Sequence, residues 1–454
     1  MAIGNVYQTR GDLDRAIEFQ QKALQLNENF GNKEGMANDY GNLGNVYKIR
    51  GDLDKAIEFY QKGLELAEEL GYKVGMANAY GNLGNVYQIR GDLDKTIEFY
   101  QKGLGLAEEL GYKEGMASAY ASLGVDYVRR GDLDKAIEFL HKALNLDEVL
   151  GNKEKMATAY VNLGYVYSIR GDLDKTIEFY QKALNLDDDL GNKEGIANAL
   201  GNLGDVYRIR GDLDKAIEYL KKALKLNEDL AKNEGIARVY NNLGNVYQTR
   251  GDLDNAIEYL QKALTLNKDL GNKEGMASAY NNLGLVYRIC GDLDRAIEYL
   301  KKALTLNEDL GNKKGMASAY GNFGSVYLIR SDLDTAIEYM QKSLKLEEDL
   351  GGKEGIAIQY GNLGIVYQNR GELGKAIEFM QKALKLNEDL GSKYGIANQY
   401  GNLEIAYKLQ GNKTEAKRYH LKNIELFKQL GSPMVKTVQT CFARPQASLW
   451  EWDF

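Results

Sequence analysis

The residues that most often carry out catalysis are scarce in this chain. Its 454 residues include two histidines, His141 and His420, and two cysteines, Cys290 and Cys441. The histidines lie far apart in the sequence, and Cys290 takes a place that elsewhere holds arginine. Zinc-protease, paired-cysteine, serine-hydrolase and phosphate-loop motifs need such residues or glycines at a set spacing, and none of these motifs is present. We therefore expect a protein that is not an enzyme and that uses no metal or cofactor.

The tripeptide Arg-Gly-Asp recurs and is a second candidate for chemistry, because it can support cell-adhesion recognition. It also fits a turn between two helices, with the arginine ending one helix and the aspartate beginning the next. The sequences at 330–332 and 370–372 keep this turn without the tripeptide, which favours the turn interpretation. The tripeptide occurs at residues 10–12, 50–52, 90–92, 130–132, 170–172, 210–212 and 250–252.

Regularly spaced asparagines offer the most promising binding chemistry. A side-chain amide both donates and accepts hydrogen bonds, so a row of amides can pair with a peptide backbone of any sequence. The same asparagines could instead bond neighbouring helices and set the geometry of the stack. The main series recurs every 40 residues as Asn42, Asn82, Asn162, Asn202, Asn242, Asn282, Asn322, Asn362 and Asn402.

Two further positions share this helix face and vary between repeats, whereas the core positions hardly change. One holds Asn45, Asn85 and Asn245, and the other holds Lys48, Arg208 and Arg288. Positions 38, 42, 45 and 49 follow the i, i+4, i+7, i+11 spacing of one helical stripe. The charges on this face are mostly basic, and the second helices carry repeated glutamates such as Glu58. We therefore predict a peptide-binding groove for an extended, polar or acidic segment.

Paired helices must position these side chains, because the whole chain is built on a 40-residue period. In the unit 32–71 we predict one helix over about 33–50 and another over about 53–70. Asn32 is a cap for the first helix, Gly51-Asp52 is the turn, and Gly71 ends the second helix. Apolar residues at helical spacing, such as Leu43 and Tyr60, form stripes that only stacked pairs can bury.

Eleven such units follow one another over residues 1–440 without an inserted or deleted residue, and a tail follows at 441–454. The first unit is truncated, because Met1 aligns with Gly41. The last is degenerate and more polar, as a capping repeat should be. We expect Ser432-Pro433 to begin one more helix, and Trp450, Trp452 and Phe454 to pack on the last repeat or on another chain.

The pattern Tyr40-x-x-Leu43-Gly44-x-x-Tyr47, followed by Gly51-Asp52, Ala56, Tyr60 and Leu64, resembles the tetratricopeptide repeat. The six extra residues per unit and the Gly-Asn-Leu-Gly-Asn string are similar to the Pins/LGN adaptors and kinesin light chains. The resemblance implies an all-α solenoid, a right-handed superhelix of antiparallel helix pairs whose groove binds protein partners. Similar arrays in large bacterial proteins imply an alternative: a sensor or regulatory arm of a signalling enzyme whose catalytic domain is absent from this chain.

Composition bounds the setting in which such a protein would act. The net charge of −7 gives no general basic field, so we expect neither nucleic-acid binding nor attraction to anionic membranes. No run of 18 apolar residues occurs, and the N-terminus does not resemble a signal peptide. Two cysteines make no disulfide framework. We therefore expect a cytoplasmic scaffold or adaptor.

Overall fold

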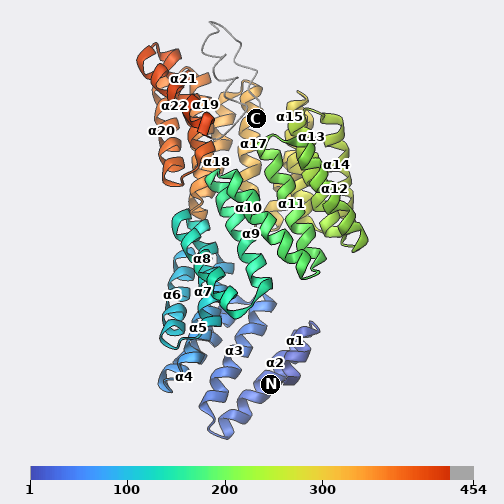
Figure 1. Cartoon of the computed structure of the whole chain (residues 1–454), viewed down its shortest axis with the longest axis vertical. Helices are drawn as coiled ribbons and strands as arrows, with labels where there is room; N and C mark the ends of the chain where they lie inside the picture. The colour runs from blue at the N-terminus through green and yellow to red at the C-terminus, as the bar shows by residue number, and fades with distance from the viewer. Residues whose placement is uncertain (1, 430–454) are drawn as a thin grey trace. The chain divides into compact units, whose positions relative to one another are not determined.

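The structure is a computed structural model that describes residues 2–429 (Figure 1). The expected helix after Ser432 and the aromatic tail lie outside the described residues. The chain divides into two units, Met1–Ala159 and Tyr160–Phe454. Every described secondary-structure element is an α-helix, and the helices follow one another as antiparallel pairs, which confirms the all-α repeat architecture.

Helix bounds match the prediction closely, with the first helix of each pair beginning one residue after its cap. In unit 1 they are α1 (Ala2–Thr9), α2 (Leu13–Asn29), α3 (Lys33–Arg50), α4 (Leu53–Glu69), α5 (Lys73–Arg90), α6 (Leu93–Glu109), α7 (Lys113–Arg130) and α8 (Leu133–Leu150). Helix α9 (Lys153–Arg170) crosses the division between the units.

In unit 2 the same pairing continues to the end of the described chain. Its remaining helices are α10 (Leu173–Asp189), α11 (Lys193–Arg210), α12 (Leu213–Asp229), α13 (Asn233–Arg250), α14 (Leu253–Asp269), α15 (Lys273–Ile289), α16 (Leu293–Asp309), α17 (Lys313–Ile329), α18 (Leu333–Leu350), α19 (Lys353–Asn369), α20 (Leu373–Asp389), α21 (Lys393–Gln410) and α22 (Lys413–Gln429).

The Arg-Gly-Asp tripeptide is the turn within each pair, and all three residues have structural roles there. Gly51 has a φ of +84°, a left-handed conformation that glycine adopts without a steric penalty. The Asp52 carboxylate accepts a hydrogen bond from the Lys55 backbone N–H at 3.2 Å and caps α4. Arg50 reaches back to Asp14 of the previous pair, with 3.1 Å between Nη1 and Oδ1. This ion pair recurs between Arg210 and Asp174 and ties adjacent repeats together.

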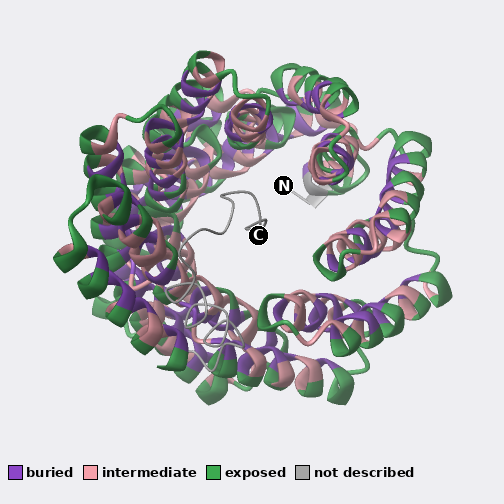
Figure 2. Cartoon of the chain, turned by 90° about the horizontal axis from the view of Figure 1, so that it is seen from above, coloured by how far each residue is buried: buried purple, intermediate pink, exposed green. Residues whose placement is uncertain are grey.

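Within each pair, a glycine on the first helix allows the second helix to approach closely. Leu43 and Val46 are completely buried, and Tyr60 crosses over Gly44. A Cβ atom on Gly44 would lie 2.6 Å from the Tyr60 ring, so any other residue would push the pair apart. Buried residues lie between the helices of neighbouring pairs, and exposed residues cover the outer surfaces (Figure 2).

The tyrosines belong mainly to this packing. In unit 1 the ring of Tyr47 stacks on that of Phe59 with 5.2 Å between centroids, and Tyr60 is buried in the same apolar cluster. In unit 2 the same stack recurs between Tyr247 and Tyr259 at 5.3 Å. The prediction that most tyrosines pack in the core is therefore confirmed for these positions.

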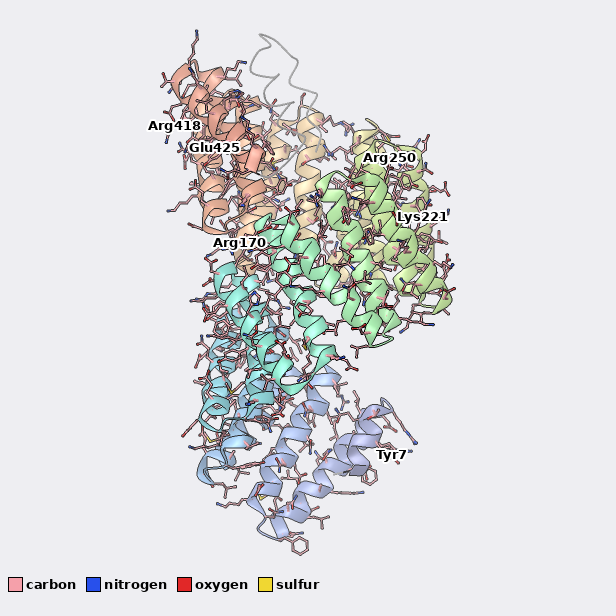
Figure 3. The ribbon with its side chains drawn as sticks, in the orientation of Figure 1. Tyr7, Arg170, Lys221, Arg250, Arg418 and Glu425 are labelled. Atoms are coloured by element: carbon pink, nitrogen blue, oxygen red, sulfur yellow. The ribbon has the colours of Figure 1, made fainter. Side chains whose placement is uncertain are left out.

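Unit 2 also contains a contact between segments more than 200 residues apart in the sequence. Tyr394, at the start of α21, packs on the apolar cluster that includes Leu173 and Tyr180 of α10. A Cβ atom on Gly171 would lie 3.1 Å from the Tyr394 ring, and Gly391 faces Arg170, which Figure 3 labels. We call this contact, between residues 170–173 and 390–394, the clasp.

Two sequence departures coincide with the clasp. The position of Tyr394 holds glutamate in most other repeats, for example Glu234 and Glu274. Leu390 is only 3% exposed, whereas its counterpart Leu310 is 39% exposed. The clasp therefore buries a leucine that the repeat pattern by itself leaves accessible.

Candidate functional site

The predicted binding residues lie along one face of the first helices, which we call the amide face. It is made by the positions of Asn42, Asn45 and Lys48 on α3 and by their equivalents on later first helices. Each residue named above for this face is half-buried: Asn42, Asn82, Asn162, Asn202, Asn242, Asn282, Asn322, Asn362, Asn45, Asn85, Asn245, Lys48, Arg208 and Arg288. Half-burial holds these side chains in place and leaves part of each open to a ligand.

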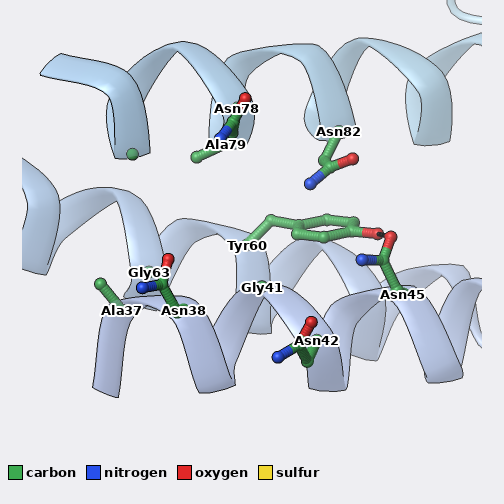
Figure 4. A pocket seen from close by; sticks show the side chains of 11 residues that line it. Ala37, Asn38, Gly41, Asn42, Asn45, Tyr60, Gly63, Asn78, Ala79 and Asn82 are labelled. Carbon is green, nitrogen blue, oxygen red and sulfur yellow. Dashed lines mark hydrogen bonds between the residues drawn. The ribbon is translucent and has the colours of Figure 1, made fainter. Parts of the chain in front are cut away.

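Two neighbouring pockets open on the amide face in unit 1. The first has a volume of about 310 Å³ and lies between α3 and α5, with Tyr60 and Gly63 of α4 at its base (Figure 4). The second has a volume of about 260 Å³ and repeats this arrangement one pair later, with Tyr100 and Gly103 at its base. Both are at or below the small end of the range for small-molecule pockets, so each has room for about one ligand side chain.

The lining of both pockets is neutral and rich in amides. Asn38, Asn42 and Asn45 face Asn78 and Asn82 across the first pocket (Figure 4). The second pocket is lined by Asn78, Asn82 and Asn85 on one side and by Ser118 and Ser122 on the other. Neither lining contains an acidic or basic side chain. Hydrogen bonding and shape, rather than net charge, would therefore select what enters.

A buried tyrosine orients one amide in each pocket. The Tyr60 hydroxyl donates a hydrogen bond to Asn45 Oδ1 at 2.8 Å, and the Tyr100 hydroxyl donates to Asn85 Oδ1 at 2.6 Å. Burial raises the pKa of Tyr100 to about 12, and burial also raises the pKa of Tyr60, so both hydroxyls keep their protons. Because each amide oxygen is engaged, the NH₂ group is the part of Asn45 and Asn85 that faces a ligand.

The main asparagine series does not behave uniformly along the chain. Asn282 Nδ2 donates to Asn241 Oδ1 at 3.1 Å, and Asn322 Nδ2 donates to Asn281 Oδ1 at 2.8 Å. Both bonds join first helices of neighbouring pairs, which is the structural role that the sequence left open. By contrast, neither Asn42 nor Asn82 has a side-chain hydrogen bond within the described part of the chain.

The basic side chains of the amide face also differ in their surroundings. Arg208 is paired with Asp205 on its own helix, with 2.9 Å between Nε and Oδ1. Burial lowers the pKa of Lys48, and Arg288 is half-buried on α15. A ligand carboxylate near Arg208 would therefore have to compete with Asp205.

No group of three metal-ligating side chains lies together within the residues that the structure describes. His420 is buried beside Glu404 on the last described pair and belongs to the packing there. Cys290 is a free, exposed thiol that replaces the arginine opposite Asp254. Among the described helices, none is both long and apolar enough to cross a bilayer.

Sequence reasoning found the amide face but missed the bases of the two pockets. Gly63 and Gly103 stand where most repeats carry alanine, such as Ala143 and Ala223. Both also occur in repeats that combine an asparagine at the position of Asn45 with a tyrosine at the position of Tyr60. This joint departure from the repeat pattern is the signal that would have revealed the pockets.

Comparison with known families agrees with the helix pairs and their spacing. The family model described as "Tetratricopeptide repeat" matches residues 1–69, 75–148, 155–229, 235–309, 275–349, 315–389 and 355–429. The chain therefore belongs to the tetratricopeptide repeat family. No curated protein matches the sequence.

Several solved structures share this fold at low sequence identity. A Rap protein complexed with competence and sporulation factor is 15% identical, with a TM-score of 0.54, covering 79% of this chain and 99% of that one. BtubC (BKLC) from P. vanneervenii is 23% identical, with a TM-score of 0.38, covering 49% of this chain and 91% of that one. A STAND-type signal transduction ATPase with a tetratricopeptide repeat sensor, from Pyrococcus horikoshii, is 16% identical, with a TM-score of 0.41, covering 85% of this chain and 55% of that one.

Proposed function

We propose that this protein is a non-catalytic scaffold or adaptor that binds an extended, polar or acidic segment of a partner protein along its amide face. The observation that carries the proposal is the row of half-buried asparagines on successive first helices, from Asn42 to Asn362. An extended peptide presents alternating N–H and C=O groups, and amides at a regular interval can pair with both. A compact small molecule would leave most of such a row unused.

Two further observations support a protein partner. The pockets of unit 1 are small and amide-lined, which suits peptide groups and side chains better than a cofactor. A Rap protein of similar fold holds competence and sporulation factor, so this helical architecture is compatible with partner binding. The free thiol of Cys290 fits a reducing compartment, and we propose the cytoplasm as the place of action.

The test begins with affinity capture of a partner on the intact chain, followed by measurement of the affinity for its binding segment. The triple variant Asn82→Ala, Asn202→Ala, Asn242→Ala removes three amides that have no intramolecular partner among the described residues. Each net hydrogen bond contributes about 0.5–1.5 kcal/mol, so the variant should lose roughly 1.5–4.5 kcal/mol of binding free energy. That loss corresponds to about a 10- to 1000-fold weaker affinity.

A matched control uses the two asparagines that bond neighbouring helices. The double variant Asn282→Ala, Asn322→Ala should lower the melting temperature, because it removes hydrogen bonds between repeats. The triple variant should melt close to the wild type. If the triple variant instead loses stability and keeps its affinity, the amide face is only structural and the proposal is wrong.

A further inference from the structure

We infer that the two pockets of unit 1 form a paired recognition site for ligand side chains that end in a carboxylate or a carboxamide, spaced three residues apart in an extended peptide. This inference rests on the proposed function and specifies which residues of the partner the protein selects. It follows from three features: an oriented donor, a glycine base and the distance between the pockets.

The oriented donor sets the chemistry of the ligand atom. Because Tyr60 donates to the oxygen of Asn45, the Asn45 NH₂ group is directed toward the ligand, and Tyr100 does the same for Asn85. Both tyrosines are buried and keep their protons, so this polarity persists at physiological pH. Each pocket therefore offers an N–H donor to a carbonyl-type oxygen. A lysine ammonium, which only donates, has no matching acceptor at this position.

The glycine base sets how far a side chain can enter. Gly63 and Gly103 lie on α4 and α6 beneath the pockets, at a position where eight of the other repeats have an alanine or serine side chain. A Cβ atom on Gly63 would approach the Ala37 carbonyl oxygen at 3.1 Å and would occupy the space at the base of the first pocket. Glycine in a helix interior costs about 0.5–1 kcal/mol relative to alanine. These two glycines therefore weaken their helices while they deepen the pockets.

The distance between the pockets sets the ligand spacing. The first helices α3 and α5 pack directly against each other, and so do the equivalent positions one repeat later. Packed helices lie ~8–10 Å apart. In a polyproline II peptide, residues i and i+3 point the same way and are ~9 Å apart. In a β-strand, residues i and i+2 share a face at only ~6.7 Å. The pocket interval therefore matches the i, i+3 spacing.

The probes are short fluorescein-labelled, proline-rich peptides that differ only at two guest positions. We expect peptides with two glutamates, or with two glutamines, at i and i+3 to bind the intact protein. Moving the guests to i and i+2, or replacing them with lysine or leucine, should weaken binding by about tenfold or more. Fluorescence polarisation at two salt concentrations separates hydrogen bonding from charge attraction, because the glutamine peptide carries no guest charge.

Protein variants test the pocket itself. Gly63→Ala with Gly103→Ala should weaken binding of both i, i+3 peptides by about tenfold, while the helices gain propensity and the protein stays folded. Gly105→Ala is the matched control, because Gly105 lies on the same helix as Gly103 and a Cβ there would meet nothing within 4 Å. Tyr60→Phe with Tyr100→Phe keeps the rings but removes the orienting hydroxyls, and it should weaken both peptides as well.

Three outcomes would overturn the inference: equal binding at both spacings, equal binding of lysine and glutamine peptides, or unchanged binding by the glycine variant. Binding of the glutamate peptide alone would also overturn it, because charge rather than an oriented donor would then select the ligand. The proposed function has a separate readout. If the captured partner responds to Asn202 and Asn242 but not to Gly63 and Gly103, the amide face binds the partner and the paired pockets do not.

Discussion

Glu404 lies beside His420 in the last described helix pair, with 3.1 Å between Glu404 Oε2 and His420 Nδ1. Every earlier repeat has glycine at the position of Glu404. The opposite position, that of His420, holds Gln20 in the first repeat and tyrosine, leucine or methionine in the others. The two replacements therefore occur together, and the smaller imidazole leaves room for the glutamate side chain.

This relationship predicts strong coupling between the two residues. His420→Tyr alone would place a tyrosine against Glu404, although a Cβ atom at the equivalent Gly44 would already lie 2.6 Å from a tyrosine ring. We expect this variant to lose about 1–3 kcal/mol of stability through overpacking. Adding Glu404→Gly should restore the stability, because it recreates the pair found in other repeats. Chemical denaturation of the two single variants and the double variant measures the coupling energy, and additive effects would contradict the prediction.

A buried carboxylate in unit 1 predicts a pH-dependent stability. Asp126 is completely buried at a position where neighbouring repeats have Val46 and Val86. Burial raises its pKa, although a hydrogen bond from Gln88 and the charge of Arg129 partly oppose this effect. The folded protein therefore favours the protonated acid. The stability that goes with it is present below the ordinary pKa and is lost as the pH rises through the raised value.

Asp126→Val should consequently stabilise the protein by about 1–3 kcal/mol near neutral pH. The advantage should shrink toward acidic pH, where the wild-type side chain is neutral. Urea denaturation at several pH values gives the difference directly. The reciprocal variant Val86→Asp should show the opposite effect with the same pH direction. A stability gain from Asp126→Val that does not change with pH would exclude the titration of Asp126 as its cause.

The clasp of unit 2 predicts a local change in backbone protection. Tyr394→Glu restores the residue that most repeats carry and places a charge against the apolar cluster around Leu173. We expect faster amide hydrogen exchange in residues 169–173 and around Leu390, with little change elsewhere. Lys314→Glu is the control, because Lys314 occupies the same repeat position and is exposed. Unchanged exchange in the Tyr394 variant would mean that the clasp does not form in solution.

Removal of one whole repeat tests the modular architecture. Deletion of residues 241–280 joins two first helices in the same register, so the shortened chain should fold with its helical content per residue retained. It loses the Arg250–Asp214 ion pair, an exposed contact that contributes about 0–1 kcal/mol. The deletion also shifts α21 by one repeat relative to α10, so the protection of residues 169–173 should be lost. Circular dichroism and hydrogen exchange measure the two effects separately, and loss of cooperative unfolding would contradict the modular fold.

Much of this fold could be predicted because local rules repeat without interruption. Gly51 and Asp52 mark a turn and a helix cap in any context, and the spacing of Leu43, Gly44 and Tyr47 requires a helix with one buried side. Helix boundaries could therefore be predicted to within a residue or two. The family resemblance then indicated how the pairs stack.

The unpredicted features depend on contacts between residues far apart in the sequence. The hydroxyl of Tyr60 was expected to reach the surface, but its bond to Asn45 depends on how α3 and α4 pack. Similarly, nothing in the local pattern around Tyr394 indicates that Gly171 lies beside it. Asn282 and Asn322 illustrate the same limit, because their partners lie on another helix pair, 41 residues earlier in the sequence.

The identical junctions between repeats also have a kinetic consequence for the newly made chain. A helix pair that is about to dock meets several almost equivalent surfaces, each 40 residues from the next, and a partner two repeats away differs from the correct one in few contact residues. Skipped-repeat intermediates are therefore nearly as stable locally as native ones, and such misassembly is typical of repeat proteins. Positions that break the pattern, such as Tyr394 and the Glu404–His420 pair, distinguish one register from another and act as reference points for correct folding.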